Sequence, residues 1–559
     1  MLSILALALC ASAAPPPAPM QHGVVHYLPE TPEQSPGQLR AIAADGYNML
    51  ILSSWVWTVP TEGSDLRRVA QVTLDWCDRN HMAVWLLHNI QWSSPGEGGD
   101  IEAALTDPTA AARRSLQPWA EVLRGHPCVA GVLLGNEVAP GGPELFGEHP
   151  RYLAAFQEWL TGKHGDISAL NRRWKTSQDA FTRVRPPFRG GALHDVRRFN
   201  RAQFARFYDS IARDVLRPVL GDKLYGSKGG ASPYILRQMP HYTVCSWDDL
   251  VANWPLWRTK LLVDTAGLPV FNSELHLYHD EFSFGPSREL SRYRYFTGAL
   301  LGEWMTASFN WGAWSKPEIA AVHAATPTAL ADLRALEPVL RAFGREPPAF
   351  SILVTEATED GIENHPRLEI AYAHAATTGL PWSFITDMDL DDLTAPTLLV
   401  DTPWLTQQAA RRLAEIAATR QVVFVGDPPA VDEYGLPLAA DPAQCAHTIA
   451  DWSALPAVVP ALRMPGPYTE IVDVPYLWWS PERGHFHFPV RYPRLEARQA
   501  VLDGVRYTAM VNHTREEVVA PAPDFSAQSS LADALTGRPE DCGALRFGPL
   551  EVKVLRAVQ

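Results

Sequence analysis

Cysteine, long apolar runs and positive charge are all scarce in this chain of 559 residues. No segment reaches about 18 uninterrupted apolar residues, which excludes a membrane-spanning helix. Lys plus Arg number 48 against 62 for Asp plus Glu, and the net charge of −14 disfavours a polyanionic partner. We therefore expect no membrane partner and no nucleic acid partner.

The six cysteines are scattered, and none lies in a CxxC pair or a Cys/His cluster. A structural zinc site is therefore not indicated. Two possibilities stay open, a disulfide between Cys445 and Cys542 or buried free thiols, because spacing does not decide pairing. The chain also lacks an HExxH motif, and no HxH pair lies near the expected strand ends, which disfavours a metal-dependent hydrolase. We expect no metal and no organic cofactor.

Residues 1–14 resemble a signal peptide. An apolar run, Leu5 to Leu9, precedes the small residues Ala11, Ser12 and Ala13, which match an A-x-A cleavage site. The run is too short to cross a bilayer as a helix. We therefore expect a secreted or periplasmic protein.

From about residue 20 to 345, short apolar runs alternate with amphipathic helical stretches such as Leu66 to Asn80 and Ala111 to Arg124. This alternation is the pattern of successive β/α units. The expected strands are Gly23 to Leu28, Tyr47 to Ser53, Ala83 to His88, Ala130 to Gly135, Leu224 to Ser227, Tyr242 to Cys245, Pro269 to Asn272 and Thr306 to Asn310. The sequence thus predicts an α/β fold in which residues 20–345 form a catalytic (β/α)8 TIM barrel.

The remaining residues predict two smaller domains. Residues 346–470 repeat the strand and helix alternation, as in a small doubly wound α/β domain, and contain neither a GxGxxG motif nor a nucleophile elbow. We expect a structural or assembly role for this domain. Residues 474–559 carry short alternating strands, such as Gly504 to Asn512 and Leu550 to Leu555, which predict a C-terminal β-sandwich.

Two of the expected barrel strands deliver a glutamate at the end where barrel active sites form. Glu137 follows the run Gly131 to Asn136, and Glu274 follows Pro269 to Ser273. By this count they close strands four and seven, across the barrel mouth from one another. Glycosidic cleavage requires two such carboxyl groups, one protonated for the leaving group and one ionised for the anomeric carbon. A single glutamate at a strand end is more often a surface group, but this pair beside Trp-rich strand ends favours catalysis.

These motifs resemble those of glycoside hydrolase clan A, and in particular of the family 42 β-galactosidases. Asn136-Glu137 and Glu274 are similar to the clan's signature on strands four and seven. Phe156 to Leu160, Gly165 and Leu170 to Trp174 resemble the family's F-x-x-W-L, Y-G and L-N-x-x-W stretch, with His164 in place of its tyrosine. The family's three-part layout also matches the predicted domains.

The resemblance implies a retaining exo-β-glycosidase that acts on a glycoside or oligosaccharide by double displacement. By this resemblance Glu137 is the acid/base, Glu274 the nucleophile and Asn136 a contact to the sugar. It further implies that Trp311 stacks on the terminal sugar. The α/β domain, flavodoxin- or amidotransferase-like, would mediate a homo-oligomer, a trimer in the family.

Other polar or aromatic residues at expected strand ends could bind sugar hydroxyl groups or stack on the sugar. They are Tyr27, Trp55, His88, Asn89, Lys228, Trp254 and His276. The resemblance implies a β-galactosidase first, but the family's arginine at the third strand end has no counterpart in Trp85 to Asn89, so a β-mannosidase of the same three-domain plan stays open as the alternative. A non-catalytic carbohydrate-binding protein is the alternative from another class.

Overall fold

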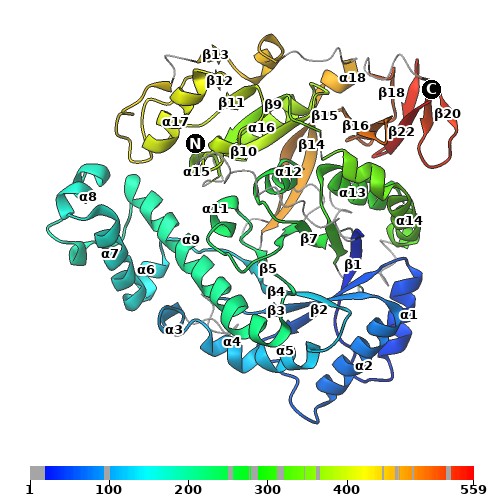
Figure 1. Cartoon of the computed structure of the whole chain (residues 1–559), viewed down its shortest axis with the longest axis horizontal. Coiled ribbons are helices and arrows are strands. Elements are labelled where there is room, and N and C mark those ends of the chain that lie inside the picture. Colours follow the sequence, from blue (N-terminus) through cyan, green and yellow to red (C-terminus); the bar gives the residue numbers. More distant parts are fainter. Residues whose placement is uncertain are drawn as a thin grey trace, which may run out of the picture.

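The computed structural model describes residues 19–92, 101–249, 256–275, 277, 288–309, 311, 320–344, 346–359, 365–442, 446–459, 464, 466–480, 484–523 and 530–558. Three regions follow one another along the chain (Figure 1): a barrel, a parallel sheet with helices, and a β-rich C-terminal part. Within the described residues, no helix combines the length and the apolar character needed to cross a membrane.

The barrel consists of eight parallel strands in the order β5-β4-β3-β2-β1-β8-β7-β6. Their bounds are β1 Gln21–His26, β2 Met49–Trp55, β3 Ala83–Asn89, β4 Val129–Val138, β5 Leu224–Gly229, β6 Cys245–Asp249, β7 Val270–Leu275 and β8 Met305–Ser308. The barrel closes between β5 and β6, where Thr243 N and Val244 N donate to Tyr225 O at 2.9 and 3.2 Å. The predicted TIM barrel is therefore confirmed.

The inward side chains of the barrel form one apolar cluster. It comprises Val25, Met49, Ile51, Trp85, Leu87, Leu133, Val244, Phe271, Met305 and Ala307. Because side chains alternate between the two faces of a strand, this cluster fixes which later residues point inward. Trp55 and Asn89 continue the inward series of β2 and β3, whereas His88 faces the helices.

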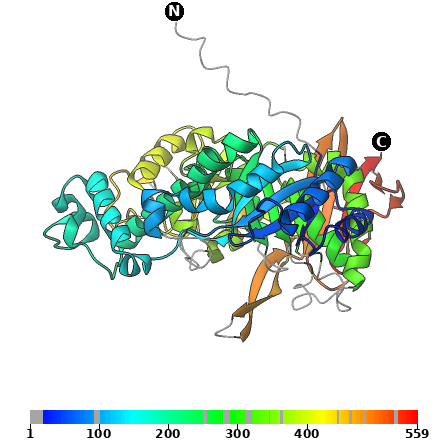
Figure 2. The same ribbon diagram turned by 90° about the horizontal axis from the view of Figure 1, so that it is seen from below.

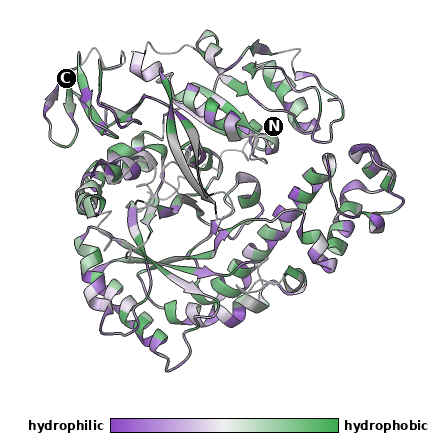
Figure 3. Cartoon of the chain, turned by 180° about the vertical axis from the view of Figure 1, so that it is seen from behind, coloured by the Kyte–Doolittle hydropathy of each residue, from purple (hydrophilic) through white to green (hydrophobic). Residues whose placement is uncertain are grey.

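The helices around the barrel carry both hydrophobic and hydrophilic residues (Figure 3), as expected of a layer with one buried side. Their bounds are α1 Ser35–Ala44, α2 Asp65–Asn80, α3 Ile101–Thr106, α4 Ala110–Ser115, α5 Gln117–Leu123, α9 Gly191–Ile211, α10 Arg217–Leu220, α11 Pro233–Leu236, α12 Leu256–Thr265, α13 Arg288–Leu301 and α14 Ala320–Ala342. The single helix predicted from Ala111 to Arg124 is wrong, because the chain forms α4 and α5. Pro118 lies in the first turn of α5, and its ring would clash with the carbonyl of residue 114 in a continuous helix.

The long connection between β4 and β5 forms a helical excursion at the outer edge of the molecule (Figure 1). It contains α6 Leu145–Glu148, α7 Pro150–His164 and α8 Ile167–Trp174. Asp195 on α9 ties it together, since this buried carboxylate accepts hydrogen bonds from His164 Nε2 and Trp174 Nε1, both at 2.8 Å. Tyr434, from the region after the barrel, donates to the same carboxylate at 2.8 Å. The motif residues His164 and Trp174 therefore hold the excursion in place.

The second region is a parallel sheet with strand order β10-β9-β11-β12-β13. Its elements are β9 Phe350–Val354, α15 Glu356–Glu359, α16 His365–Ala376, β10 Trp382–Thr386, β11 Thr397–Val400, α17 Gln407–Ala417, β12 Gln421–Val425 and β13 His447–Ile449. Doubly wound sheets bind ligands where the strand order reverses, here between β9 and β11. At this point Glu356 accepts hydrogen bonds from Arg198 Nε at 2.8 Å and Arg201 at 3.1 Å, both on α9. Barrel side chains thus contact the edge at which such sheets bind ligands.

The C-terminal part packs two antiparallel sheets against each other. The larger has the order β16-β17-β22-β19-β20, and the smaller pairs β18 with β21. A buried cluster that includes Leu495, Val518, Phe547 and Leu555 takes residues from both sheets. The bounds are α18 Gly466–Thr469, β14 Ile471–Ser480, β15 Gly484–Pro493, β16 Leu495–Leu502, β17 Val505–Asn512, β18 Val518–Ala520, β19 Ser530–Asp533, β20 Pro539–Glu540, β21 Leu545–Phe547 and β22 Val552–Val558. The β14–β15 hairpin projects from the body of the molecule (Figure 2).

Candidate active site

Glu137 lies in a local distortion at the end of β4. The pairing of β4 with β5 shifts register between Leu134 and Val138, and within this bulge Gly135 and Glu137 adopt φ values of +71° and +54°. A left-handed conformation costs a residue other than glycine roughly 1–2 kcal/mol. The distortion leaves the Glu137 side chain exposed. Such strain at the mouth of a barrel is typical of a functional position.

Gly135 has no room for a side chain at this bulge. A Cβ atom there would lie 2.4 Å from Val138 Cγ1 and 3.0 Å from Ile90 O. The close approach of the backbone therefore requires glycine, in addition to the positive φ.

Glu274 lies at the end of β7, where the strand is also irregular. Its pairing shifts register against β6 after Trp247 and against β8 between Asn272 and Leu275. Ser273 Oγ donates to Trp247 O at 3.0 Å and fixes this irregular segment to β6. The side chain of Glu274 is almost fully buried, with 3% of the residue exposed.

Lys228 joins the two strand ends. Its ammonium group, on a residue that is 1% exposed, forms an ion pair with Glu274 Oε2 and a hydrogen bond to Asn136 Oδ1. The same Asn136 accepts a hydrogen bond at its backbone oxygen from Gln91 Nε2 at 3.1 Å. Strands β4, β5 and β7 are therefore connected through Asn136, Lys228 and Glu274. In this arrangement the buried carboxylate has an opposite charge beside it, as burial of a charge requires.

Asn89 is the inward residue at the end of β3. It is 2% exposed, and among the described residues neither its Oδ1 nor its Nδ2 has a hydrogen-bond partner. Buried amides without partners are rare in folded proteins. The amide of Asn89 is therefore available to a ligand inside the mouth.

His88 lies outside this group, although it precedes Asn89 directly. Its Nδ1 and Nε2 are 2.9 and 3.0 Å from the hydroxyl groups of Ser54 and Ser115. Burial lowers the pKa of His88 to about 3, so that the ring is neutral. The structure places His88 between β3 and the helix layer and does not bring it to the mouth.

Tyr27 and Trp55 follow or end neighbouring strands of the same mouth, β1 and β2. Tyr27 is 46% exposed, and Trp55 is half-buried and stacks on Trp57. Trp57 was not among the predicted site residues, although its spacing from Trp55 could have indicated a second ring at this strand end. Trp311 is half-buried, and its ring makes an edge-to-face contact with His323 on α14. The predicted site residues Trp254 and His276 lie outside the described residues.

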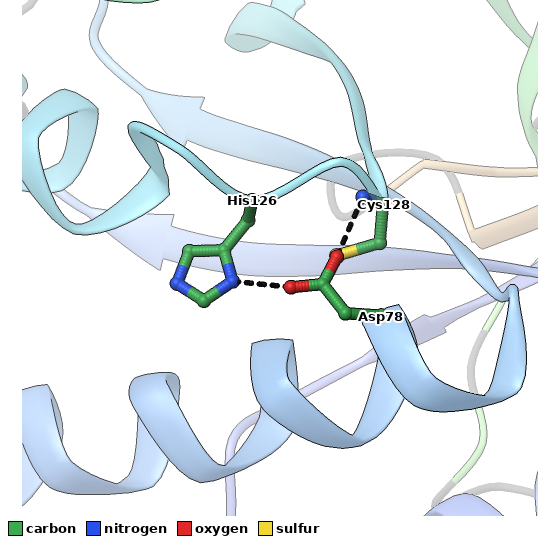
Figure 4. A group of neighbouring side chains, drawn as sticks. All are labelled: Asp78, His126 and Cys128. Atoms are coloured by element: carbon green, nitrogen blue, oxygen red, sulfur yellow. Dashed lines mark hydrogen bonds and ion pairs between the residues drawn. The ribbon is translucent and has the colours of Figure 1, made fainter.

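The opposite face of the barrel carries the one group in the described part of the chain that could hold a metal ion (Figure 4). It consists of Asp78, His126 and Cys128, whose ligand atoms lie within 4.8 Å of one another. His126 Nδ1 lies 2.6 Å from Asp78 Oδ2, and Cys128 N donates to Asp78 Oδ1 at 2.7 Å. Burial and the nearby carboxylate of Asp78 raise the pKa of the Cys128 thiol, which disfavours the thiolate that a metal would need. Hydrogen bonding therefore accounts for this group.

Comparison with known proteins gives one family match and several shared folds. The family model described as Beta-galactosidase, that of glycoside hydrolase family 42, matches residues 107–228, which include β4, the excursion and β5. No curated protein sequence matches the chain.

Solved structures match the chain over nearly its whole length. An exo-carrageenase of family 42 from Bacteroides ovatus has 15% identity and a TM-score of 0.68, over 97% of this chain and 82% of that chain. A β-galactosidase from Bacillus circulans sp. alkalophilus has 14% identity and a TM-score of 0.68, and the match covers 97% of this chain and 99% of that chain. A catalytic mutant of the family 42 β-galactosidase Gan42B from G. stearothermophilus also has 14% identity and a TM-score of 0.68, and the match covers 96% of this chain and 98% of that chain. The resemblance to family 42 that the sequence motifs indicated is confirmed, and at these identities the solved structures establish the shared fold.

Proposed function

We propose that this chain, which has the fold of family 42 and matches the family's model, is a retaining exo-β-glycosidase with β-galactosides as its leading substrates. The observation that carries the proposal is the buried Glu274, paired with Lys228 and connected through Asn136 to the strand end that bears Glu137. The known proteins of the same fold include β-galactosidases and an exo-carrageenase, which favours a terminal galactose unit.

In the first step, the carboxylate of Glu274 attacks the anomeric carbon while Glu137 protonates the glycosidic oxygen. The bond from the anomeric carbon to that oxygen breaks, and an ester between the sugar and Glu274 forms. In the second step, Glu137 takes a proton from water, the resulting hydroxide oxygen replaces Glu274, and the sugar leaves with its configuration retained. The different burial of the two residues suits this division, since Glu137 is exposed and can exchange its proton with water.

Lys228 is a positioning residue in this scheme. It holds one oxygen of Glu274 and the amide oxygen of Asn136 at the same ammonium group. A positive charge beside a carboxyl group favours its ionised form, which is the form that attacks. Lys228 therefore orients the nucleophile and favours its charge.

The sugar itself is decided by a substrate panel. We expect purified protein to release nitrophenol from the aryl β-galactoside more rapidly than from the β-mannoside, β-glucoside and β-fucoside, with Glu274→Gln as the matched control. A preference for the mannoside would make the chain a β-mannosidase, the alternative within the same reaction class. If the wild type neither binds nor cleaves any of these glycosides, the proposed glycosidase is contradicted. If the wild type binds sugar without turnover and Glu274→Gln binds equally well, the chain is a carbohydrate-binding protein instead.

We also propose that the protein is exported and forms a homo-oligomer, with a trimer as the leading arrangement. The A-x-A pattern at Ala11 to Ala13 supports export, and the fold shared with family 42 supports the assembly. Light scattering on the full chain would measure the mass of the particle, and a monomer would contradict the assembly.

A further inference from the structure

Exposed aromatic side chains gather at one side of the barrel mouth. In the described part of the chain, the exposed aromatic residues are Tyr27, at 46%, and Trp57, at 61%. Both follow the carboxyl ends of neighbouring strands, β1 and β2. Both rings therefore lie on the side of the barrel that carries the candidate active site, and Trp57 is the more exposed of the two.

The segment that carries Trp57 is held in a tight turn. Thr58 Oγ1 donates to Trp55 O at 2.8 Å and accepts a hydrogen bond from Trp55 N at 2.7 Å. The backbone N–H of Thr58 also donates to Trp55 O at 2.8 Å, and Trp119 Nε1 donates to Thr58 O at 2.7 Å. The position of the exposed ring is therefore fixed before any ligand arrives.

Trp57 rests on Trp55, which points toward the interior of the barrel. The two rings stack with their centroids 5.0 Å apart and an angle of 14° between their planes. One face of Trp57 is thus occupied by Trp55, and the residue as a whole still has most of its surface exposed. An exposed indole face attracts the C–H face of a sugar ring.

The burial of the site residues sets the order in which a chain of sugars would lie. Glu274 is 3% exposed and Asn89 is 2% exposed, so the terminal sugar must reach the buried level of the mouth. Glu137, which protonates the glycosidic oxygen in the proposed mechanism, is exposed. The sugar beyond that oxygen therefore lies at the outer level, where Trp57 is.

We propose that Trp57, supported by Trp55, forms the subsite for the first sugar of the leaving group. This inference rests on the proposed function and makes it more specific: the natural substrate is an oligosaccharide, and its leaving group is itself a sugar. Thr58 and Trp119 contribute only by fixing the turn.

The experiment compares two substrates that share the terminal sugar. Lactose has glucose as its leaving group, and methyl β-galactoside has only methanol. Both substrates release galactose, so the galactose that forms measures the cleavage of either one. In Trp57→Ala, we expect the ratio of kcat/KM for lactose to that for the methyl glycoside to fall about three- to tenfold, mainly through the KM for lactose. Trp57→Phe, which keeps an aromatic face, should retain most of the ratio and also controls for folding.

The outcomes separate this inference from the proposed function. If the wild type cleaves both substrates and both variants keep the wild-type ratio, Trp57 is not a leaving-group subsite and the proposed glycosidase stands. If the wild type cleaves neither these two nor the corresponding mannosides, the proposed function itself fails. An equal loss for the two substrates in Trp57→Ala would also overturn the subsite, because it would indicate a general disturbance of the mouth.

Discussion

The two faces of the barrel carry similar residue types in different states. At the face opposite the mouth, both oxygens of Asp78, near the end of α2, have partners. One lies beside His126 Nδ1, and the other accepts a hydrogen bond from the backbone nitrogen of Cys128, just before β4. At the mouth, Glu137 has a positive φ, and the buried amide of Asn89 has no hydrogen-bond partner in the described part of the chain. The first arrangement is complete without a ligand, whereas the second is not.

This difference indicates what each face contributes. Satisfied hydrogen bonds at the ends of strands stabilise the fold, and substitutions there should change stability. Strained or unsatisfied groups cost free energy that the rest of the structure must supply, and substitutions there should change activity. The following variants test whether the two faces separate in this way.

The largest effect is expected for Glu137→Gln. Removal of the proposed general acid/base should lower kcat/KM for an alkyl β-glycoside by about 10²- to 10⁴-fold. An aryl glycoside with a good leaving group should lose less in the first step, because it needs less protonation. Thermal unfolding should show a wild-type midpoint, and an equal loss of activity on both substrates would argue against the acid role.

Lys228→Met should change the pH dependence of the reaction. Without the neighbouring positive charge, the carboxyl group of Glu274 would lose the interaction that favours its ionised form. Since the ionised form attacks in the proposed mechanism, the acidic limb of the kcat/KM profile should move to higher pH. Lys228→Arg keeps the charge and serves as the control. A loss of activity that is equal at all pH values would indicate a purely structural lysine.

A substitution of Glu303 tests how a buried carboxyl group at the face opposite the mouth affects stability. Glu303 lies just before β8 and is 6% exposed. Burial raises the pKa of Glu303 from 4.5 to about 7, and the charge of Arg294 offsets this only in part. Between these values the folded state holds a proton that the unfolded state has lost, so stability falls as pH rises from about 4.5 to about 7. Glu303→Gln should remove this decrease, on the order of 2 kcal/mol between pH 5 and pH 8. Urea unfolding at both pH values measures it, and parallel behaviour of the two proteins would contradict the assignment.

Asp78→Asn should have the smallest effect. Burial raises the pKa of Asp78, but the hydrogen bonds from Cys128 and His126 outweigh it and leave this pKa below its ordinary value. The carboxylate therefore stabilises the fold above the pKa of the unfolded chain, and this contribution disappears as pH falls through the lower folded pKa. At pH 7 we expect a loss of about 1 kcal/mol in urea unfolding with an unchanged KM. A changed KM would mean that the two faces are coupled.

Much of the fold could be predicted because apolar runs mark buried strands. The predicted strand Ala83 to His88 falls one residue short of β3, and the predicted strand Leu224 to Ser227 lies within β5. The errors have local causes, such as Pro118, which divides one predicted helix into α4 and α5. The strand β10 was not predicted, because its five residues follow a short segment with Gly and Pro and carry no distinctive pattern.

The candidate site was predictable in part. Strand ends indicated Glu137, Glu274, Asn136 and Lys228, because polar residues after apolar strands are recognisable in sequence. Their connection through the ammonium group of Lys228 was not, since it depends on two register shifts that only the folded barrel defines. The outward position of His88 follows from strand alternation, but only once the inward cluster identifies which face is which.

The glycine at position 135 has a consequence for how this protein can diverge. A Cβ there would overlap Val138, and one at Gly229 would lie 2.6 Å from the backbone nitrogen of the same residue. The backbone beside Glu137 therefore has no room for a side chain at either of these two glycines. Trp57, at the rim of the mouth, is 61% exposed, so its side chain has space around it that Gly135 lacks. If the proposed function is right, substitutions at the rim can alter the sugar that is accepted, whereas substitutions at Gly135 and Gly229 would first displace the chain beside Glu137.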